Sequence, residues 1–390
     1  MDELYELPKG WEWKNIGETC ENLDRLRKPI TQKDRIHGIY PYYGATKIVD
    51  YINDYIFDEQ LILIGEDGAK WDTGDETAFI ANGKYWVNNH AHVIKPDRSI
   101  LIDSWLVYYL FITDLSKYIT GTTVPKLNQA KLKGIVFPLP PLKEQKRIIL
   151  KLDNIFSKID KSITLNKQNI YESNTFLGSV LNDTFKTLNN NNLTELKNVT
   201  SKIGSGSTPR GGQKAYKTEG ISLIRSMNVH DDGFREKGLA FIDDEQAKKL
   251  DNVTIQENDV LLNITGASVA RCCIVDKNYL PARVNQHVSI LRLKDEMLPA
   301  FLHYYLISPT IKTELLKSSS GGATREAITK TMLEEFQVPV VPLSQQEKIV
   351  TYLDEISQKI EKIKSVQTEK MESLVALKAS ILDQAFRGEL

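Results

Sequence analysis

The stretch Pro141-Leu142-Lys143-Glu144-Gln145-Lys146-Arg147-Ile148-Ile149 occurs a second time, with substitutions, as Pro342-Leu343-Ser344-Gln345-Gln346-Glu347-Lys348-Ile349-Val350. The two copies stay in register without a gap as far as Phe185 and Phe386. Each copy opens a segment whose apolar residues recur every three or four positions, which predicts a long amphipathic helix. An internal repeat of this kind is interpreted first because it constrains the whole fold.

The two predicted helices run from about residue 143 to 188 and from residue 343 to the C-terminus, and each would be about 65–70 Å long at 1.5 Å per residue. Their apolar positions have the spacing of a coiled coil. We therefore predict that the helices pack on each other through one set of aliphatic residues. This set comprises Ile148, Leu152, Ile155, Ile159, Ile349, Leu353, Ile356 and Ile360. The alternative is that each helix is buried in a separate core.

Two local features of these helices are also predicted. Ser344 followed three residues later by Glu347 is the signature of a capping box at the start of the second helix. Phe176 and Leu377 belong to the apolar stripes of the first and the second helix. Both are therefore expected to face the interior.

The long helices divide the rest of the chain into two blocks. The predicted domains are residues 1–140, the central helix 141–188, residues 189–341 and the C-terminal helix 342–390. Both blocks contain short β-branched and aromatic runs, broken by Gly, Pro and Asn, which predict short strands. The fold class is therefore α+β, with two similar α/β domains separated by a long two-helix coiled coil and an internal pseudo-twofold repeat.

The two blocks also match each other weakly in sequence. The segment Asn88-Asn89-His90 matches Asn285-Gln286-His287, and Gly68-Ala69 matches Gly266-Ala267. A third match pairs residues 12–16 with residues 195–199. These matches predict that the two blocks share one fold but have diverged greatly in sequence.

Composition limits the class of protein without naming it. The net charge is −1, and no long segment is strongly basic. If the chain binds nucleic acid, its charges must be sorted onto one face. Cys20, Cys272 and Cys273 are too few for a disulfide framework. The absence of a long apolar stretch predicts no membrane span, so the cytoplasm is the expected compartment.

A duplicated chain with two similar but different domains suggests recognition of a two-part target. Duplex DNA is such a target, because half-sites lie about one helical turn or more apart along one face. Divergent domains would read different half-sites and so an asymmetric sequence. Contacts are expected from polar and basic side chains on loops. The candidate DNA-binding residues are Arg27, Lys28, Lys47, Lys126, Arg210, Lys214, Arg225, Asn228 and Arg325.

Several segments in order resemble one known family. They are Leu7-Pro8-Lys9-Gly10-Trp11-Glu12-Trp13, the run Leu63–Ala69, the openings of the two repeated helices, and the C-terminal segment Ile381–Leu390. Together they resemble the specificity (S) subunit of type I restriction–modification enzymes over essentially the whole chain. The resemblance implies two target recognition domains that bind double-stranded DNA, separated by a long antiparallel helix pair.

The same resemblance implies that this chain carries no chemistry. The family's subunit directs two methyltransferase (M) subunits to adenines in a split site and joins restriction and translocase (R) subunits. S-adenosylmethionine, ATP and Mg²⁺ would be bound by those partners, so no cofactor or metal is expected here. Two alternatives stay open, a self-contained DNA methyltransferase or nuclease and a coiled-coil scaffold whose heads bind proteins.

The residues themselves give little support to an active site. We find no Asn-Pro-Pro-aromatic, GxGxxG or Walker motif. Glu12-Trp13-Lys14 and Glu195-Leu196-Lys197 have an acid-x-Lys pattern, which a repeated first strand explains as well. Glu66-Asp67 is expected to form a turn. His90 and His92 are expected to share one strand face, where packing or hydrogen bonding competes with metal ligation.

Overall fold

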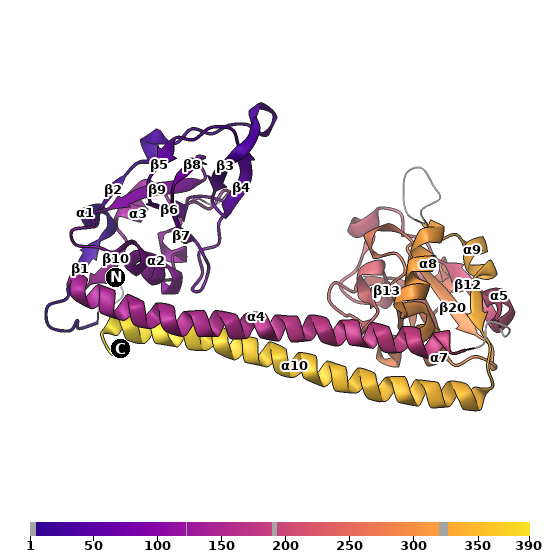
Figure 1. Cartoon of the computed structure of the whole chain (residues 1–390). Coiled ribbons are helices and arrows are strands. Elements are labelled where there is room, and N and C mark those ends of the chain that lie inside the picture. The colour runs from indigo at the N-terminus through magenta and orange to yellow at the C-terminus, as the bar shows by residue number, and fades with distance from the viewer. Residues whose placement is uncertain (1–4, 122, 189–192, 320–326) are drawn as a thin grey trace. The chain divides into compact units, whose positions relative to one another are not determined.

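The computed structural model describes residues 5–121, 123–188, 193–319 and 327–390 (Figure 1). The chain divides into two compact units. Unit 1 comprises Met1–Lys167 and Thr368–Leu390, and unit 2 comprises Gln168–Gln367. Within the described residues, no helix combines the length and the hydrophobicity needed to cross a membrane.

Two helices of 45 residues each, α4 (Leu142–Lys186) and α10 (Leu343–Arg387), contribute to both units. In the core of unit 1, Leu152 and Phe156 from the first half of α4 pack with Leu382 and Phe386 from the end of α10. In the core of unit 2, the end of α4 packs with the beginning of α10. The helices are therefore antiparallel, as the family resemblance implied, and each also enters the core of a globular head (Figure 1).

The eight aliphatic residues of the predicted helix pair are all buried or half-buried. The four on α4 lie in unit 1 and the four on α10 lie in unit 2, so the two sets do not pack on each other. Ile148 and Leu152, for example, contribute to the core of unit 1 together with Phe386. The antiparallel direction explains this, because equivalent positions of a repeat lie at opposite ends of such a pair.

Two predictions about the long helices are wrong. Ser344 is the second residue of α10 and no cap, because α10 begins at Leu343. The carbonyl of Pro342 accepts the backbone N–H of Gln345 at 2.8 Å and of Gln346 at 3.0 Å. Phe176 and Leu377 are exposed, at 58% and 48% respectively. The four-and-three spacing drifts around a straight helix, so a stripe this long leaves the buried side.

The first head, between β1 and β10 in unit 1, contains two four-stranded sheets, ordered β2-β9-β6-β7 and β4-β3-β8-β5. Strand β3 runs parallel to β8. The elements of this head are β1 (Glu12–Asn15), α1 (Ile16–Thr19), β2 (Cys20–Asn22), β3 (His37–Gly44), β4 (Lys47–Ile52), β5 (Phe57–Asp58), β6 (Leu61–Gly65), β7 (Ala78–Ala81), β8 (Lys84–Val87), β9 (Ala91–Pro96), α2 (Asp103–Ile112), α3 (Gln129–Lys133) and β10 (Val136–Leu139).

The second head, between β11 and β21 in unit 2, repeats this plan with a four-stranded sheet, β12-β20-β17-β18, and a three-stranded sheet, β16-β13-β19. Strand β13 runs parallel to β19. Its elements are β11 (Leu193–Glu195), α5 (Leu196–Val199), β12 (Thr200–Ser205), β13 (Ile221–Ile224), β14 (Val229–His230), β15 (Gly233–Phe234), β16 (Ala240–Ile242), α6 (Asp244–Lys248), β17 (Val260–Asn263), β18 (Cys272–Ile274), β19 (Ala282–Val284), β20 (Val288–Leu293), α7 (Pro299–Ile307), α8 (Pro309–Ser319), α9 (Lys330–Glu335) and β21 (Gln337–Pro339).

The sequence match of residues 12–16 with residues 195–199 is out of register. The Ile16 N–H donates to the Ile135 carbonyl at 3.0 Å, and the Leu196 N–H donates to the Phe336 carbonyl at 2.8 Å. Leu196 therefore occupies the position of Ile16. The two acid-x-Lys patterns stand at different places in the fold, and in each one the lysine pairs with its own glutamate. A common position in both heads therefore does not explain them.

Candidate nucleic-acid interface

Each head contains the same polar turn, directly before β9 or β20. The side chain of Asn88 accepts the His90 N–H at 2.8 Å, and that of Asn285 accepts the His287 N–H at 3.0 Å. Such a side-chain bond two residues ahead is an Asx turn, which fixes the backbone locally. The residue in the middle, Asn89 or Gln286, is exposed. The predicted match between these segments is therefore confirmed in the structure.

The backbone around this turn is also the same in both heads. The Glu66 N–H donates to the His90 carbonyl at 2.8 Å, and the Ile264 N–H donates to the His287 carbonyl at 2.9 Å. Asp67 and Thr265, the next residues, therefore occupy equivalent positions. We call the segments that follow β2, β3 and β6 and precede β9, and those that follow β12, β13 and β17 and precede β20, the strand-end loops.

In the first head the strand-end loops enclose a hydrogen-bonded histidine. His92 is fully buried, its Nδ1 lies 2.6 Å from the Asp24 carboxylate, and its Nε2 lies 2.6 Å from the Leu127 carbonyl. A carbonyl only accepts, so Nε2 carries a proton. Burial would raise the pKa of Asp24, but hydrogen bonds from His92 and from the Val93 N–H hold this pKa below its usual value.

Glu66 completes the cluster with two cations. Its carboxylate pairs with Arg27 and, at 2.8 Å, with the Lys126 ammonium. One ligand atom each from Asp24, Glu66 and His92 lie within 4.8 Å of one another, a spacing that could suit a metal ion. Because Arg27 and Lys126 already neutralise Glu66, these contacts favour an internal ion-pair network. Glu66 is thus part of this network, and Asp67 forms an isolated β-bridge with Lys126 rather than the expected turn.

In the second head the equivalent loops are uncharged at this place. The Thr208 hydroxyl donates to the Gln286 side-chain carbonyl. The Gln286 amide nitrogen lies 3.1 Å from His287 Nε2, and His287 Nδ1 contacts the Thr265 hydroxyl. Two heads with one backbone plan therefore present different polar groups, ionic in the first and neutral in the second.

The candidate DNA-binding residues differ in whether their side chains are exposed and whether they already have a partner. Lys28, Arg210 and Lys214 are exposed. Across the ranges that the structure describes, none of these three forms an ion pair. Lys47 pairs with Glu76, and the Arg225 guanidinium lies 5.1 Å from the centre of the Tyr216 ring.

Three other candidates are not free on the surface. Arg27 is 12% exposed and bound to acids, and Asn228 is fully buried, with its amide donating to the Arg235 carbonyl at 2.9 Å. Lys126 is 43% exposed but holds Glu66. Arg325 lies outside the described residues. Sequence position indicated a loop for Arg27 and Asn228 but gave no signal that their side chains turn inward.

The expectation that His90 and His92 share one strand face is wrong. Strand β9 begins at Ala91, so His90 lies in the turn, where its ring is 51% exposed and contacts Asp67. The ring of His92 is bound to Asp24 instead. Alternation of side chains holds only within a strand. Sequence reasoning also missed Gln286, Thr208 and Thr265, although the matched Asn-Asn-His and Asn-Gln-His segments pointed to the first.

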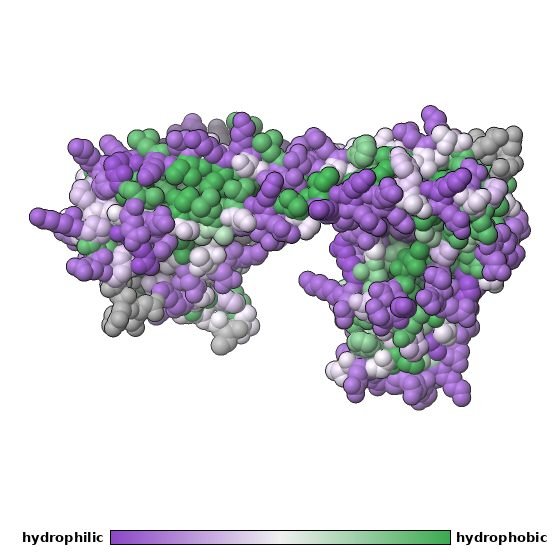
Figure 2. Space-filling view, turned by 90° about the horizontal axis from the view of Figure 1, so that it is seen from below, coloured by the Kyte–Doolittle hydropathy of each residue, from purple (hydrophilic) through white to green (hydrophobic). Residues whose placement is uncertain are grey.

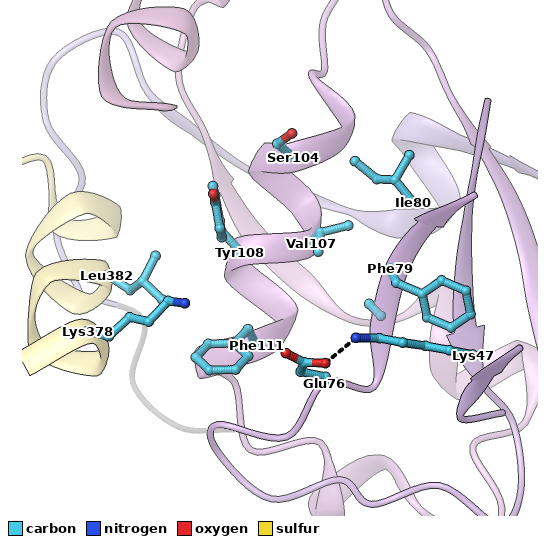
Figure 3. A pocket seen from close by; sticks show the side chains of 11 residues that line it. Lys47, Glu76, Phe79, Ile80, Ser104, Val107, Tyr108, Phe111, Lys378 and Leu382 are labelled. Atoms are coloured by element: carbon cyan, nitrogen blue, oxygen red, sulfur yellow. Dashed lines mark hydrogen bonds and ion pairs between the residues drawn. The ribbon is translucent and has the colours of Figure 1, made fainter. Parts of the chain in front are cut away.

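A cavity of about 280 Å³ in unit 1 offers no chemistry (Figure 3). It lies among β7, α2 and α10, and Figure 3 shows Lys47 and Glu76 paired at its edge. Most of the lining is apolar, including Phe79, Val107 and Phe111. The Tyr108 hydroxyl, also in the lining, is engaged with the Asp153 carboxylate at 2.5 Å.

The cysteines are also unsuited to nucleophilic chemistry. Cys272 and Cys273 are buried, and burial raises the pKa of Cys20 and of Cys273 to about 12. The thiolate is the reactive form, so these thiols are inert near neutral pH.

Comparison with known proteins gives a consistent result. The family described as "Type I restriction modification DNA specificity domain" matches residues 8–173 and again residues 179–370. A Haemophilus influenzae protein assigned as a type I restriction enzyme specificity subunit, S.HindORF215P, is 26% identical over 88% of this chain and 86% of its own length. The type I restriction enzyme MjaVIII specificity subunit of Methanocaldococcus jannaschii is 24% identical over 98% of this chain and 94% of its own.

Among solved structures, a chain from work on complex assembly and conformational transition of the type I R-M system has the same fold. Its TM-score is 0.71 at 22% sequence identity, and the match covers 99% of this chain and 100% of the other. The family match covers both halves of the repeat. The chain therefore belongs to the family of type I restriction–modification DNA specificity subunits.

Proposed function

We propose that this chain selects the DNA site of a type I restriction–modification system by reading two different half-sites, one with each head. The observation that carries this proposal is the common backbone plan of the strand-end loops with different polar groups on it. A shared scaffold allows each head to meet duplex DNA in the same way, whereas different polar groups read different bases. The resulting site is bipartite and asymmetric.

In this proposal the recognition domains lie within residues 1–140 and 189–341, and the helices 141–188 and 342–390 join them. Methyl transfer and cleavage belong to other subunits, two methyltransferase copies and the restriction subunits, which would bind S-adenosylmethionine, ATP and Mg²⁺. Lys28, Arg210 and Lys214 are the proposed phosphate contacts, because they are exposed and pair with no acid among the described residues.

Docking of two identical methyltransferase copies requires two equivalent surfaces on the duplicated chain. The long helices expose apolar residues at matching positions of the repeat, Leu165 with Val366 and Phe176 with Leu377. Figure 2 shows hydrophobic residues gathered in patches between hydrophilic ones on the face it presents. Exposed apolar patches of this kind mark protein interfaces. We propose these two pairs as part of the methyltransferase docking surface.

Methylation mapping tests the function. The chain and its neighbouring methyltransferase are expressed in a host without DNA methylation, and the host DNA is sequenced for modified adenine, with the methyltransferase alone as control. A split, asymmetric motif that depends on this chain is the expected result. If an active, soluble methyltransferase gives no motif when the chain is present, the recognition function is wrong and the scaffold alternative gains support.

A further inference from the structure

We propose that the exposed carboxamide at the Asx turn of each head, Gln286 in the second and Asn89 in the first, reads an adenine in the half-site of that head. This inference rests on the proposed DNA-recognition function. It assigns the base contact to one position of the fold, whereas the candidates considered so far are mostly basic residues that would contact phosphate.

The side chain of Gln286 is held in place by its neighbours. Thr208 donates to the carbonyl oxygen of the amide, and the amide nitrogen lies 3.1 Å from His287 Nε2. The nitrogen of an amide only donates, so Nε2 of His287 accepts and the proton of the neutral ring lies on Nδ1, facing the Thr265 hydroxyl. His287 itself is fixed by the bond of its backbone N–H to Asn285.

These bonds leave part of the amide unused. A carboxamide has two N–H donors and two acceptor lone pairs. Thr208 and His287 take one of each, so Gln286 retains one donor and one acceptor on an exposed side chain. A paired donor and acceptor is the group that matches N7 and the N6 amino group of adenine in the major groove. A side chain that is already fixed loses little conformational entropy on binding.

The surroundings of Gln286 suit a polyanion. Arg210 and Lys214 lie on the same strand-end loop as Thr208. Both are exposed, and neither has an acid partner within residues 193–319 or elsewhere in the described ranges. Phosphate contacts from such cations would position the duplex, while the carboxamide reads the base edge.

Asn89 occupies the same position of the same turn in the first head. Its side chain is exposed and makes no hydrogen bond within the part of the chain that the structure describes, whereas its carbonyl accepts from Arg27 at 3.4 Å. Lys28 follows Arg27 on the neighbouring loop. The Asn89 side chain is one methylene shorter than that of Gln286 and has ionic neighbours. The two heads would therefore hold their carboxamides at different positions relative to the DNA.

Two single substitutions, one in each head, test the inference, and each variant serves as the control for the other. Gln286→Ala and Asn89→Ala are co-expressed with the methyltransferase, and the methylated motif is mapped beside that of the wild type. Each should relax one adenine position, in one half-site only, with a roughly 10- to 100-fold loss of discrimination. Gln286→Glu keeps the shape but presents acceptors only, so its preference should move from adenine toward cytosine, whose N4 donates.

The outcomes separate this inference from the function it rests on. A wild-type chain that yields no split motif refutes the proposed function. A wild-type motif that survives unchanged in Gln286→Ala and in Gln286→Glu refutes the base contact at Gln286 alone. Relaxation at positions in both half-sites, or at a base other than adenine, would also overturn the assignment. Competition binding with duplexes that carry each base at the relaxed position then measures the loss directly.

Discussion

The side chain of Gln346 makes the same three hydrogen bonds as the side chain of Gln145, at the start of the other long helix. Both are fully buried. Gln145 accepts the Ile102 N–H at 2.8 Å and donates to the Ile100 and Pro140 carbonyls at 2.7 and 2.8 Å. Gln346 accepts the Leu298 N–H and donates to the Glu296 and Val341 carbonyls, each at 2.8 Å. Each amide therefore joins a long helix to the start of its head's helix, α2 or α7.

We expect Gln346→Ala to destabilise the second head by about 2–4 kcal/mol, because it removes the side-chain partner of three backbone groups, of which the Val341 carbonyl is buried. Hydrogen exchange should accelerate in α7, and Gln145→Ala should produce the same change in α2. Gln345→Ala, at the exposed neighbouring position, is the matched control. Equal exchange in α7 for Gln346→Ala and the control would contradict a role for this amide.

The C-terminal ends of the two long helices should contribute to the stability of the heads as much as their N-terminal ends do. The ring of Phe386 lies 4.6 Å from that of Trp105, and the ring of Phe185 lies 5.5 Å from that of Phe301. Truncation of a buried phenylalanine costs about 3–5 kcal/mol, so Phe386→Ala should lower the free energy of unfolding of the first head by this amount. Denaturant titration with hydrogen exchange would localise the loss. The control is Phe176→Ala, at an exposed position, which should change stability by less than about 0.5 kcal/mol.

The cluster around Asp24 predicts a pH dependence for the first head. The pKa of the Asp24 carboxyl is lowered in the folded state, whereas in the unfolded chain it is about 3.9. The ionised carboxylate therefore stabilises the folded head above about pH 3.9, and this stabilisation is lost as the pH falls through the lowered pKa. Asp24→Asn should cost about 3 kcal/mol at pH 7, because His92 loses a buried partner. Unfolding curves measured from pH 7 to pH 3 should show the difference from wild type shrinking toward acid.

The exposed Asp244→Asn substitution is the control for this experiment. It should leave the pH dependence of stability unchanged. A difference between Asp24→Asn and wild type that stays constant down to pH 3 would show that the Asp24 charge does not stabilise the head.

The repeat made the long helices and the two heads predictable, whereas the antiparallel direction of the helices came from the family resemblance. Gln145 and Gln346 recur in the repeated motif, and both side chains make equivalent hydrogen bonds. Asn88-Asn89-His90 likewise matches Asn285-Gln286-His287, and each segment forms the same kind of turn. At these positions a side chain makes the contact that shapes the backbone, so the same residue type recurs in both halves of the repeat.

The predictions that failed depended on local patterns without their tertiary surroundings. Ser344 and Glu347 have the spacing of a cap, but the helix begins at Leu343, two residues before the start that a cap at Ser344 would give, and the Pro342 carbonyl accepts its first backbone bonds. Arg27 and Asn228 lie in polar loops, yet their side chains bond inward to Glu66 and to the Arg235 carbonyl. Glu66 is 39 residues from Arg27 and Arg235 is 7 residues from Asn228, and no sequence pattern marks either partner, so only the folded chain reveals these contacts.

The last prediction concerns the cations of the second head. Arg210 is exposed and pairs with no acid in the described ranges, whereas Arg235 pairs with Asp232 at 2.9 Å. If Arg210 contacts a phosphate, Arg210→Ala should weaken DNA binding alike for specific and unrelated duplexes and should reduce the slope of log K against log salt by about 1. Arg235→Ala is the matched control and should leave this slope nearly unchanged. Binding titrations of the complex with its methyltransferase between 50 and 200 mM salt, the range over which phosphate contacts have large effects, would measure both slopes. An unchanged slope for Arg210→Ala would remove this residue from the interface without touching the base contact at Gln286, since discrimination between bases is measured at one fixed salt concentration.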